Sequence, residues 1–297
     1  MKPLIQTVSE TLDRELDQQR FLLVGNAQRK RTAFLYEPNA TAPSIIVRIP
    51  GHWDTVSNCQ AEHEGLREFA RLDINGMLAP EALGTCTLGD TQCFLQRFLP
   101  SSQWMGSLPN QRKIPVADHI SKATSHLIDL FHASKRTSPD DPICNAHCFQ
   151  HRDFWLGNLG WQGRTLVLYD FEYARPDGYP LFDLLHFVLY YRVALRNRKL
   201  VRQNVAGGEY QRDKEERNFA LTTEDINTVL VASTSYRNMV CDAIARYCGA
   251  CGIDSDTAGR LVFDFIENQV ENSRGLKGMS ANWAQPITDQ IKKRMES

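Results

Sequence analysis

The chain has 297 residues, 42% of them hydrophobic, which is enough for one large core or for two lobes. Its formal net charge of −1 leaves no global excess of either sign, so composition gives no argument for binding nucleic acid or an anionic membrane surface. The sequence shows no apolar signal region at its start and no apolar run of about twenty residues. We therefore expect a cytoplasmic protein without a membrane span.

The first predicted elements are a helix and a hairpin. Apolar residues at helical spacing predict an amphipathic helix over residues 4–16. Residues 21–24 and 32–36 have the composition of two strands, and they are joined by a polar, basic connection that begins at Gly25. Arg29, Lys30 and Arg31 in this connection either lend charge to a bound anion or are simply exposed to water, and the sequence leaves both interpretations open.

Three more elements follow before residue 100. The apolar residues 45–50 predict a strand, and Arg48 interrupts it. Leu66, Phe69 and Leu72 recur at helical intervals and predict a helix over residues 59–72. Residues 91–99 predict another strand, which ends at Pro100.

The stretch 145–185 contains three polar residues of the kind that phosphoryl transfer requires. Asp153 and Asn158 lie five residues apart in a loop that we expect to follow an apolar helix over residues 120–131, and Asp170 ends a predicted strand over residues 165–169. A loop and a strand end can converge on one cleft. There, one carboxylate would face an attacking hydroxyl, while an amide and a second carboxylate would offer magnesium the hard oxygen ligands it prefers.

The eight cysteines are scattered along the chain, which favours reduced thiols over a disulfide framework. Residues 144–151 contain zinc-like ligands, but the run leads into the polar loop, where His151 is better suited to orienting the backbone. Residues 248–251 form a Cys-x-x-Cys that ends a helical pattern and lacks the strand of a thioredoxin unit. We expect these cysteines to pack at the end of a helix.

The combination of His151-Arg-Asp153, Asn158 and Asp170-Phe-Glu resembles the catalytic core of the protein-kinase-like phosphotransferases, within them the aminoglycoside phosphotransferase and choline kinase superfamily. By motif, the resemblance covers residues 21–186. It implies an α+β, bilobal protein-kinase-like fold, with a small N-terminal lobe containing an antiparallel sheet over residues 1–98 and a larger, mostly helical lobe over residues 99–297. It also implies ATP and Mg²⁺ as cofactors.

The same resemblance implies a role for each residue of the motif. Asp153 would be the base, or would orient the hydroxyl, and Asn158 and Asp170 would hold Mg²⁺. His151 and Asp183 would support the catalytic loop, although a simple helix cap at Asp183 would look the same in sequence.

In the N-terminal lobe the resemblance implies a nucleotide site. Arg48 takes the place of the phosphate-binding lysine and is expected to pair with Glu62, with Glu64 as the second choice. The other implied nucleotide contacts are Gly25 in the phosphate-covering loop, and Gln96 and Phe98 in a hinge whose backbone would bond an adenine edge.

Departures from the family pattern keep two alternatives open. Gly25 is the only glycine of its loop and Arg48 replaces a lysine, which would suit a kinase-like nucleotide-binding module without turnover. The second alternative is a protein kinase, because Arg152 completes the His-Arg-Asp sequence that is typical of protein kinases. Only twelve residues separate Asp170 from Asp183, however, and these are too few for the activation segment of a protein kinase. We expect Arg152 to pair instead with a local carboxylate, Glu172 or Asp177.

The remaining chain is predicted to be helical over residues 184–191, 224–247, 257–272 and 286–295, and it would bind a small-molecule hydroxyl acceptor. Its candidate carboxylates and aromatic residues select neither an aminoglycoside nor a choline-like cation: Asp242, Asp264, Glu267 and Glu271; Tyr190, Tyr191, Tyr236 and Trp283. A basic group in an expected insertion over residues 192–217 favours a neutral or anionic acceptor such as a sugar: Arg192, Arg196, Arg198, Lys199 and Arg202.

Overall fold

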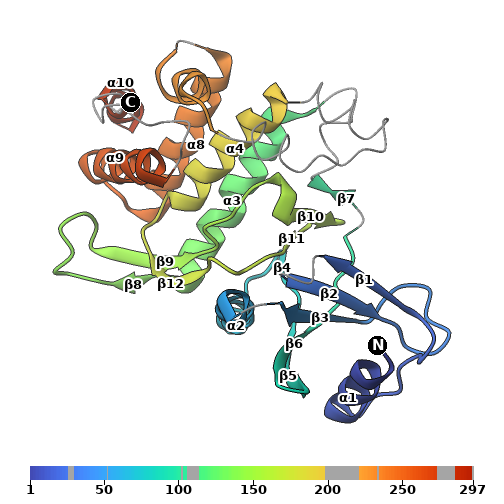
Figure 1. Ribbon diagram of the computed structural model, residues 1–297. Coiled ribbons are helices and arrows are strands. Elements are labelled where there is room, and N and C mark those ends of the chain that lie inside the picture. Colours follow the sequence, from blue (N-terminus) through green and yellow to red (C-terminus); the bar gives the residue numbers. More distant parts are fainter. Residues whose placement is uncertain are drawn as a thin grey trace.

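The computed structural model describes residues 1–25, 30–51, 53–101, 103–105, 114–197, 221–232, 234–272 and 285–295. Figure 1 shows an antiparallel sheet in a small N-terminal region and a mostly helical C-terminal part. The α+β fold class predicted from the sequence is confirmed. The boundary near residue 98 stays a prediction.

The N-terminal region is built on one sheet with the strand order β1-β2-β3-β6-β5, antiparallel throughout. The strands are β1 (Phe21–Gly25), β2 (Lys30–Leu35), β3 (Ile45–Pro50), β5 (Ala82–Leu88) and β6 (Thr91–Arg97). Because side chains alternate along a strand, Ala33, Leu35 and Val47 fall on one face, where they form a buried core with helix α1 (Lys2–Leu12). Helix α1 ends before the predicted residue 16, since Asp13 adopts a left-handed conformation with φ of 49°.

Helix α2 (Trp53–Ala70) connects the two parts of the molecule and begins earlier than the predicted residue 59. It packs beside the sheet in Figure 1 and buries Leu66 and Phe69 in the C-terminal core. At Gly65, a Cβ would lie 3.0 Å from the carbonyl oxygen of Phe171 and 2.9 Å from the Cβ of Ala174. A glycine there lets α2 approach the segment that follows Asp170.

The C-terminal part contains two small sheets and the larger helices. One sheet joins β4 (Met77–Leu78), β11 (Thr165–Leu168), β10 (Leu159–Gln162) and β7 (Gln103–Trp104), and the other joins β12 (Arg175–Gly178), β9 (Ala146–Gln150) and β8 (Arg136–Thr137). The helices are α3 (Val116–Ser134), the short η2 (Leu156–Asn158), α4 (Phe182–Arg196), α7 (Thr223–Ile226), the π-helix η3 (Asn227–Val231), α8 (Ser235–Cys251), α9 (Ser255–Asn272) and α10 (Gln285–Met295).

Two predicted elements need correction. The expected catalytic loop, residues 151–158, is entered from strand β9, not from a helix, because α3 ends at Ser134 and the chain first turns back through β8. The single helix predicted over residues 224–247 is divided into α7, η3 and α8. The hydroxyl of Thr234 accepts a hydrogen bond from the backbone N–H of Arg237 and so caps a new helix, which the periodic apolar pattern conceals.

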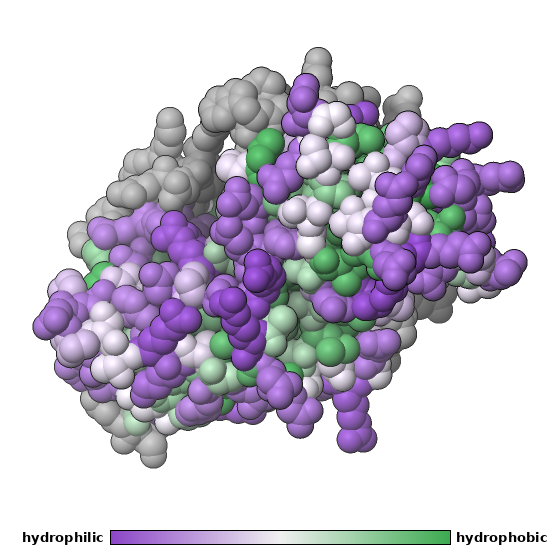
Figure 2. Space-filling view, turned by 90° about the horizontal axis from the view of Figure 1, so that it is seen from below, coloured by the Kyte–Doolittle hydropathy of each residue, from purple (hydrophilic) through white to green (hydrophobic). Residues whose placement is uncertain are grey.

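The surface is mostly polar in the view of Figure 2, and the thiols are buried. The face in Figure 2 is largely hydrophilic, with hydrophobic residues in small patches. Within the described ranges, no helix has the length and apolar character that a membrane crossing requires. All eight cysteines are buried free thiols.

Candidate active site

The loop after β9 is fixed by a buried histidine. The Nε2–H of His151 donates to the carbonyl oxygen of Tyr169 at 2.8 Å, and its Nδ1 accepts from the backbone N–H of Asp153 at 3.3 Å. Both contacts suit the neutral ring, and burial lowers the pKa of His151 to about 4. The next residue, Arg152, has φ of 63°, an unusual conformation for a residue with a side chain. The imidazole therefore holds a strained turn next to Asp153.

Asp183 supports the same turn from the first helical turn of α4. Its carboxylate accepts the backbone N–H groups of His151 at 2.7 Å and Arg152 at 2.8 Å, so the side chain contacts the catalytic loop and does not cap its own helix. Burial raises the pKa of Asp183 to about 6, although these two hydrogen bonds oppose the shift. The bracing contact implied by the family resemblance is present.

Asp153 and Asn158 are joined directly. The amide Nδ2 of Asn158 donates to Asp153 Oδ2 at 2.7 Å and to the carbonyl oxygen of Asp153 at 3.1 Å. The Trp155 side chain also hydrogen-bonds the Asp153 carboxylate. Burial, followed by the negative charge of Asp170, raises the pKa of Asp153 to about 6. The carboxylate is thus oriented and made more basic than an ordinary aspartate.

Asp170 lies just beyond strand β11, with φ of 61°. Its Oδ1 is buried without a hydrogen-bond partner in the described part of the chain, and burial, then the charge of Glu62, raises its pKa. The following Phe171 is fully buried, with ring centroids 4.7 Å from His151 and 5.4 Å from Phe69 of α2. This aromatic contact fixes Asp170 relative to both α2 and the catalytic loop.

Arg48 and Glu62 form a buried ion pair across β3 and α2. Arg48 Nη2 lies 2.8 Å and Nε 3.2 Å from Glu62 Oε1, and Nη1 donates to Thr32 Oγ1 at 2.9 Å. Burial alone would raise the pKa of Glu62, but the charges of Arg48 and Lys30 outweigh it and the pKa is lowered. Glu64, the second choice, is exposed and bonds Gln60 on its own helix.

Lys30 is a site residue that the sequence alone does not identify. Its Nζ lies 3.0 Å from Glu172 Oε2, 3.5 Å from Glu62 Oε2 and 3.7 Å from Asp170 Oδ1. The available signal was strand alternation: Lys30 shares a face of β2 with Thr32, which bonds Arg48, and Arg31 falls on the other face. Arg29 lies outside the described residues.

The expected partners of Arg152 are wrong. No ion pair joins Arg152 to Glu172 or Asp177, both of which the structure describes, because Glu172 already binds Lys30. The guanidinium of Arg152 lies instead over the ring of Phe182, 5.1 Å from its centroid. The arginine side chain covers the start of α4 and forms no ion pair with Glu172 or Asp177.

The expected hinge contacts stay a prediction, and the backbone of both residues lies in or beside the sheet. Gln96 is buried inside β6, paired with Ile46 of β3 on one side and Ala82 of β5 on the other. The N–H of Phe98 donates to the carbonyl oxygen of Ser44 at 2.8 Å. The sheet therefore uses the backbone that was expected to bond a base. Gly25, by contrast, has φ of 106°, and a Cβ there would overlap the Lys30 carbonyl oxygen, so the hairpin needs this glycine.

Four of the acceptor candidates have structural roles. Arg196 is bound to the buried Asp225 and to Thr222, at the cap of α7, which removes it from an acceptor site. The hydroxyl of Tyr191 bonds His119 at 2.8 Å, and that of Tyr236 donates to the Val188 carbonyl oxygen at 2.6 Å. Asp242 pairs with Arg294. Arg198, Lys199, Arg202 and Trp283 lie outside the described residues.

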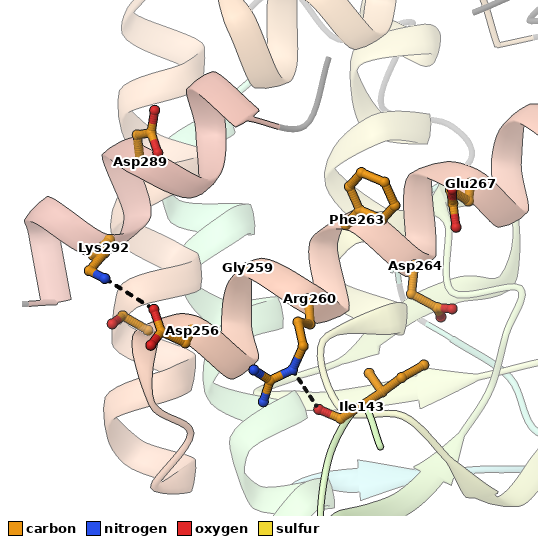
Figure 3. Close-up of a pocket in the computed structure, with 10 residues that line it drawn as sticks. Ile143, Asp256, Gly259, Arg260, Phe263, Asp264, Glu267, Asp289 and Lys292 are labelled. Atoms are coloured by element: carbon orange, nitrogen blue, oxygen red, sulfur yellow. Dashed lines mark hydrogen bonds and ion pairs between the residues drawn. The ribbon is translucent and has the colours of Figure 1, made fainter. Parts of the chain in front are cut away.

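Figure 3 shows where two of the remaining carboxylates lie. Asp264 and Glu267 line a cavity of about 570 Å³ between α9, α10 and Ile143, and none of the catalytic-loop residues borders it. Tyr190 is different: it stacks on His186 with ring centroids 4.3 Å apart, and burial together with the charge of Asp153 raises its pKa. Tyr190 is thus an acceptor candidate close enough to Asp153 to feel its charge.

The donor set at Asp170 fits magnesium. Asp170 Oδ1 is a buried carboxylate oxygen without a hydrogen bond, and Asn158 uses its N–H₂ on Asp153, which leaves its carbonyl oxygen as a ligand. Magnesium usually takes one or two protein oxygens and completes its shell with phosphates and water. Among the described side chains, no group of three or more His, Cys, Asp or Glu is arranged to hold a metal. A metal here would therefore rely on the nucleotide for the rest of its shell.

No family model and no curated protein matches this chain. Similar solved structures include the aminoglycoside phosphotransferase APH(3'')-Id from Streptomyces rimosus, with 10% identity and a TM-score of 0.40 over 67% of this chain and 90% of that one. They also include the GDP and kanamycin complex of APH(2'')-IIIa, with 10% identity and a TM-score of 0.43 over 90% of this chain and 98% of that one. At these values the likeness carries no argument about family or activity.

Proposed function

We propose that the protein transfers the terminal phosphoryl group of ATP to a hydroxyl of a small molecule. The observation that supports this most directly is the contact between two clusters of polar and charged side chains. Asp153 and Asn158, joined at 2.7 Å, come from the catalytic loop, and Asp170 connects them through Lys30 to the Arg48–Glu62 pair. Phosphoryl transfer depends on alignment and charge neutralisation, and these two clusters supply both.

The nucleotide would lie against the sheet face that carries Arg48. Cross-strand register puts Val24 opposite Thr32 and Leu22 opposite Phe34, on the face where Thr32 bonds Arg48. Leu22 and Val24 are 51% and 50% exposed, an apolar surface on which a base can pack. In this proposal the base is held by packing on β1 and β2, and the hinge amides first expected to bind it stay within the sheet.

The transfer itself would be organised by Asp153. The acceptor hydroxyl gives its proton to the Asp153 carboxylate as its oxygen bonds to the terminal phosphorus, while the bond from that phosphorus to the bridging oxygen breaks and ADP leaves. Asn158 holds the carboxylate in place at 2.7 Å. Mg²⁺, when bound by Asn158 and Asp170, would neutralise phosphate charge. Arg48 would bind phosphate oxygens through the N–H groups that are left after its three hydrogen bonds to Glu62 and Thr32.

The acceptor is proposed to be a small molecule, and Arg196 of the basic group gives no support for an anionic one. Arg196 is committed to Asp225, so its charge is already compensated within the fold. Near Asp153 the structure offers two aromatic residues, Tyr190 and Tyr173, and Tyr173 is 55% exposed. Such side chains suit the apolar face of a sugar or a similar ring as well as a cation.

The test is ADP release from purified protein with Mg-ATP across sugars, aminoglycosides and amino alcohols, with Asp153→Asn as the matched control. Acceptor-dependent ADP release that the variant loses would support the proposal. Binding of ATP without turnover on any acceptor would favour a nucleotide-binding module. Phosphate transfer to a generic protein substrate, unaffected by small alcohols, would favour a protein kinase.

A further inference from the structure

Lys30 is not a solvent-exposed cation of the hairpin. Its side chain is only 24% exposed, and its Nζ contacts carboxylates from two separate parts of the chain: Glu62 of α2, and Asp170 and Glu172 beyond β11. Lysine side chains lose considerable rotamer freedom when they are held, so a half-buried lysine with three acidic neighbours is an ordered residue.

The two cations of the site contact different sets of carboxylates. Three carboxylates, Glu62, Asp170 and Glu172, face two cations, Arg48 and Lys30. Arg48 directs two N–H donors to Glu62 and a third to Thr32. The closest contact of Lys30 is with Glu172, and its ammonium is also the cation that reaches Asp170 among the described ion pairs.

The position that Lys30 occupies conflicts with a metal on Asp170. A magnesium ion would lie about 2.1 Å from a ligating oxygen, whereas the ammonium is now 3.7 Å from the same Oδ1. Two cations sharing a half-buried carboxylate repel each other strongly. When metal and nucleotide enter, the ammonium must move, and its flexible four-carbon stem allows it to follow the phosphates.

We propose that Lys30 is a phosphate-binding residue that neutralises Asp170 and Glu172 while the site is empty and transfers to the nucleotide phosphates when the metal and nucleotide bind. The inference rests on the proposed function for its second half. Its first half, competition between Lys30 and a metal for Asp170, concerns the protein without nucleotide and can be tested separately.

The first experiment measures Mn²⁺ binding in the absence of nucleotide, by electron paramagnetic resonance of the free ion. Lys30→Gln should bind Mn²⁺ about tenfold more tightly than the wild type, because a charge-assisted contact that competes for Asp170 is gone. Arg31→Gln is the matched control: it removes the same charge from the next residue of β2, on the opposite face, and should leave Mn²⁺ affinity unchanged. Equal affinity in Lys30→Gln and the wild type would overturn the proposal.

The second experiment measures ATP affinity with saturating Mg²⁺, by calorimetry. Lys30→Gln should bind Mg-ATP about tenfold more weakly, Arg31→Gln should bind as the wild type does, and Lys30→Arg, which keeps the charge, should recover most of the lost affinity. Undiminished binding by Lys30→Gln would remove the phosphate role. Lys30→Arg also answers the objection that any change at Lys30 disturbs folding, since it should retain both affinities.

The two arms separate the failure of this inference from the failure of the proposed function. If the wild type binds Mg-ATP and releases no ADP with any acceptor, the function fails while Lys30 keeps its role. If the wild type turns over normally and Lys30→Gln has unchanged affinities for Mn²⁺ and Mg-ATP, the inference fails while the function stands.

Discussion

The contact that joins the sheet to α2 can be tested by replacing Glu62 with glutamine. Glu62 is 1% exposed and holds two cations, Arg48 through two hydrogen bonds and Lys30 at 3.5 Å. Glutamine has nearly the same shape, so Glu62→Gln removes the charge without opening a cavity. Arg48 and Lys30 would then lose the carboxylate that they share.

The magnitude follows from burial. Removing one partner of a buried ion pair costs ~3–5 kcal/mol, because the other charge stays desolvated. Here the side chains of Arg48 and Lys30 are 19% and 24% exposed, so water can compensate in part. We therefore expect Glu62→Gln to lower the free energy of unfolding by about 3 kcal/mol, the low end of that range.

Urea unfolding at neutral pH and low salt measures this value, with Glu64→Gln as the control. Glu64 lies two residues away on the same helix, is exposed and accepts a hydrogen bond from Gln60 of that helix, so its replacement should change stability by less than about 0.5 kcal/mol. A cycle with Arg48→Gln should show strong coupling to Glu62→Gln and none to Glu64→Gln. If the two glutamate variants were equally stable, the argument that a shared buried carboxylate fixes α2 would be refuted.

Three further predictions concern the catalytic loop and the hairpin. Asp153→Asn should keep Mg-ATP affinity and lower turnover by ~10²-fold or more, measured as ADP release with the best acceptor. Because the folded-state pKa of Asp183 is raised to about 6 from 3.8, the stability it contributes is complete below pH 3.8 and is lost as the pH rises through 6. Asp183→Asn should remove that part of the pH dependence, on the order of 3 kcal/mol, from urea unfolding between pH 4 and 7. Gly25→Ala should weaken Mg-ATP binding several-fold, since a Cβ at φ of 106° would displace Lys30; calorimetry showing wild-type affinity would contradict this.

The parts of the site that the sequence predicts are those defined by short-range patterns. Asp153 and Asn158 belong to one loop, and their contact at 2.7 Å needs only five residues of chain. Arg48 and Glu62 lie on consecutive elements, strand β3 and helix α2, and the family resemblance implied their pairing. Burial distinguishes Glu62, which is 1% exposed, from the exposed Glu64 on the same helix.

The parts that the sequence does not predict depend on contacts between distant segments. Lys30 meets Glu172 across 142 residues, and nothing in a basic hairpin tip indicates an acidic partner so far along the chain. Arg196 appeared to belong to a basic patch because its partner, Asp225, follows 29 residues later in an unremarkable polar stretch. Strand β9 was missed because its five residues carry no clear alternation and are buried mostly by tertiary packing.

Neutral and charged groups have different roles in the site, and this leaves carboxylate oxygens of Asp153 and Asp170 available to bind a proton or a metal. The strained turns at Arg152 and Asp170 are held by the neutral imidazole of His151, the buried ring of Phe171 and the two backbone N–H groups that Asp183 accepts. None of these contacts uses an oxygen of Asp153 or Asp170. Asp153 is oriented by an amide, which leaves it able to accept a proton, and Asp170 keeps a buried oxygen without a hydrogen bond. Such an oxygen is costly in an empty site, and the nearby ammonium of Lys30 reduces that cost. The same reasoning accounts for a lysine at this position, because its flexible stem lets the ammonium leave Asp170 when a metal binds.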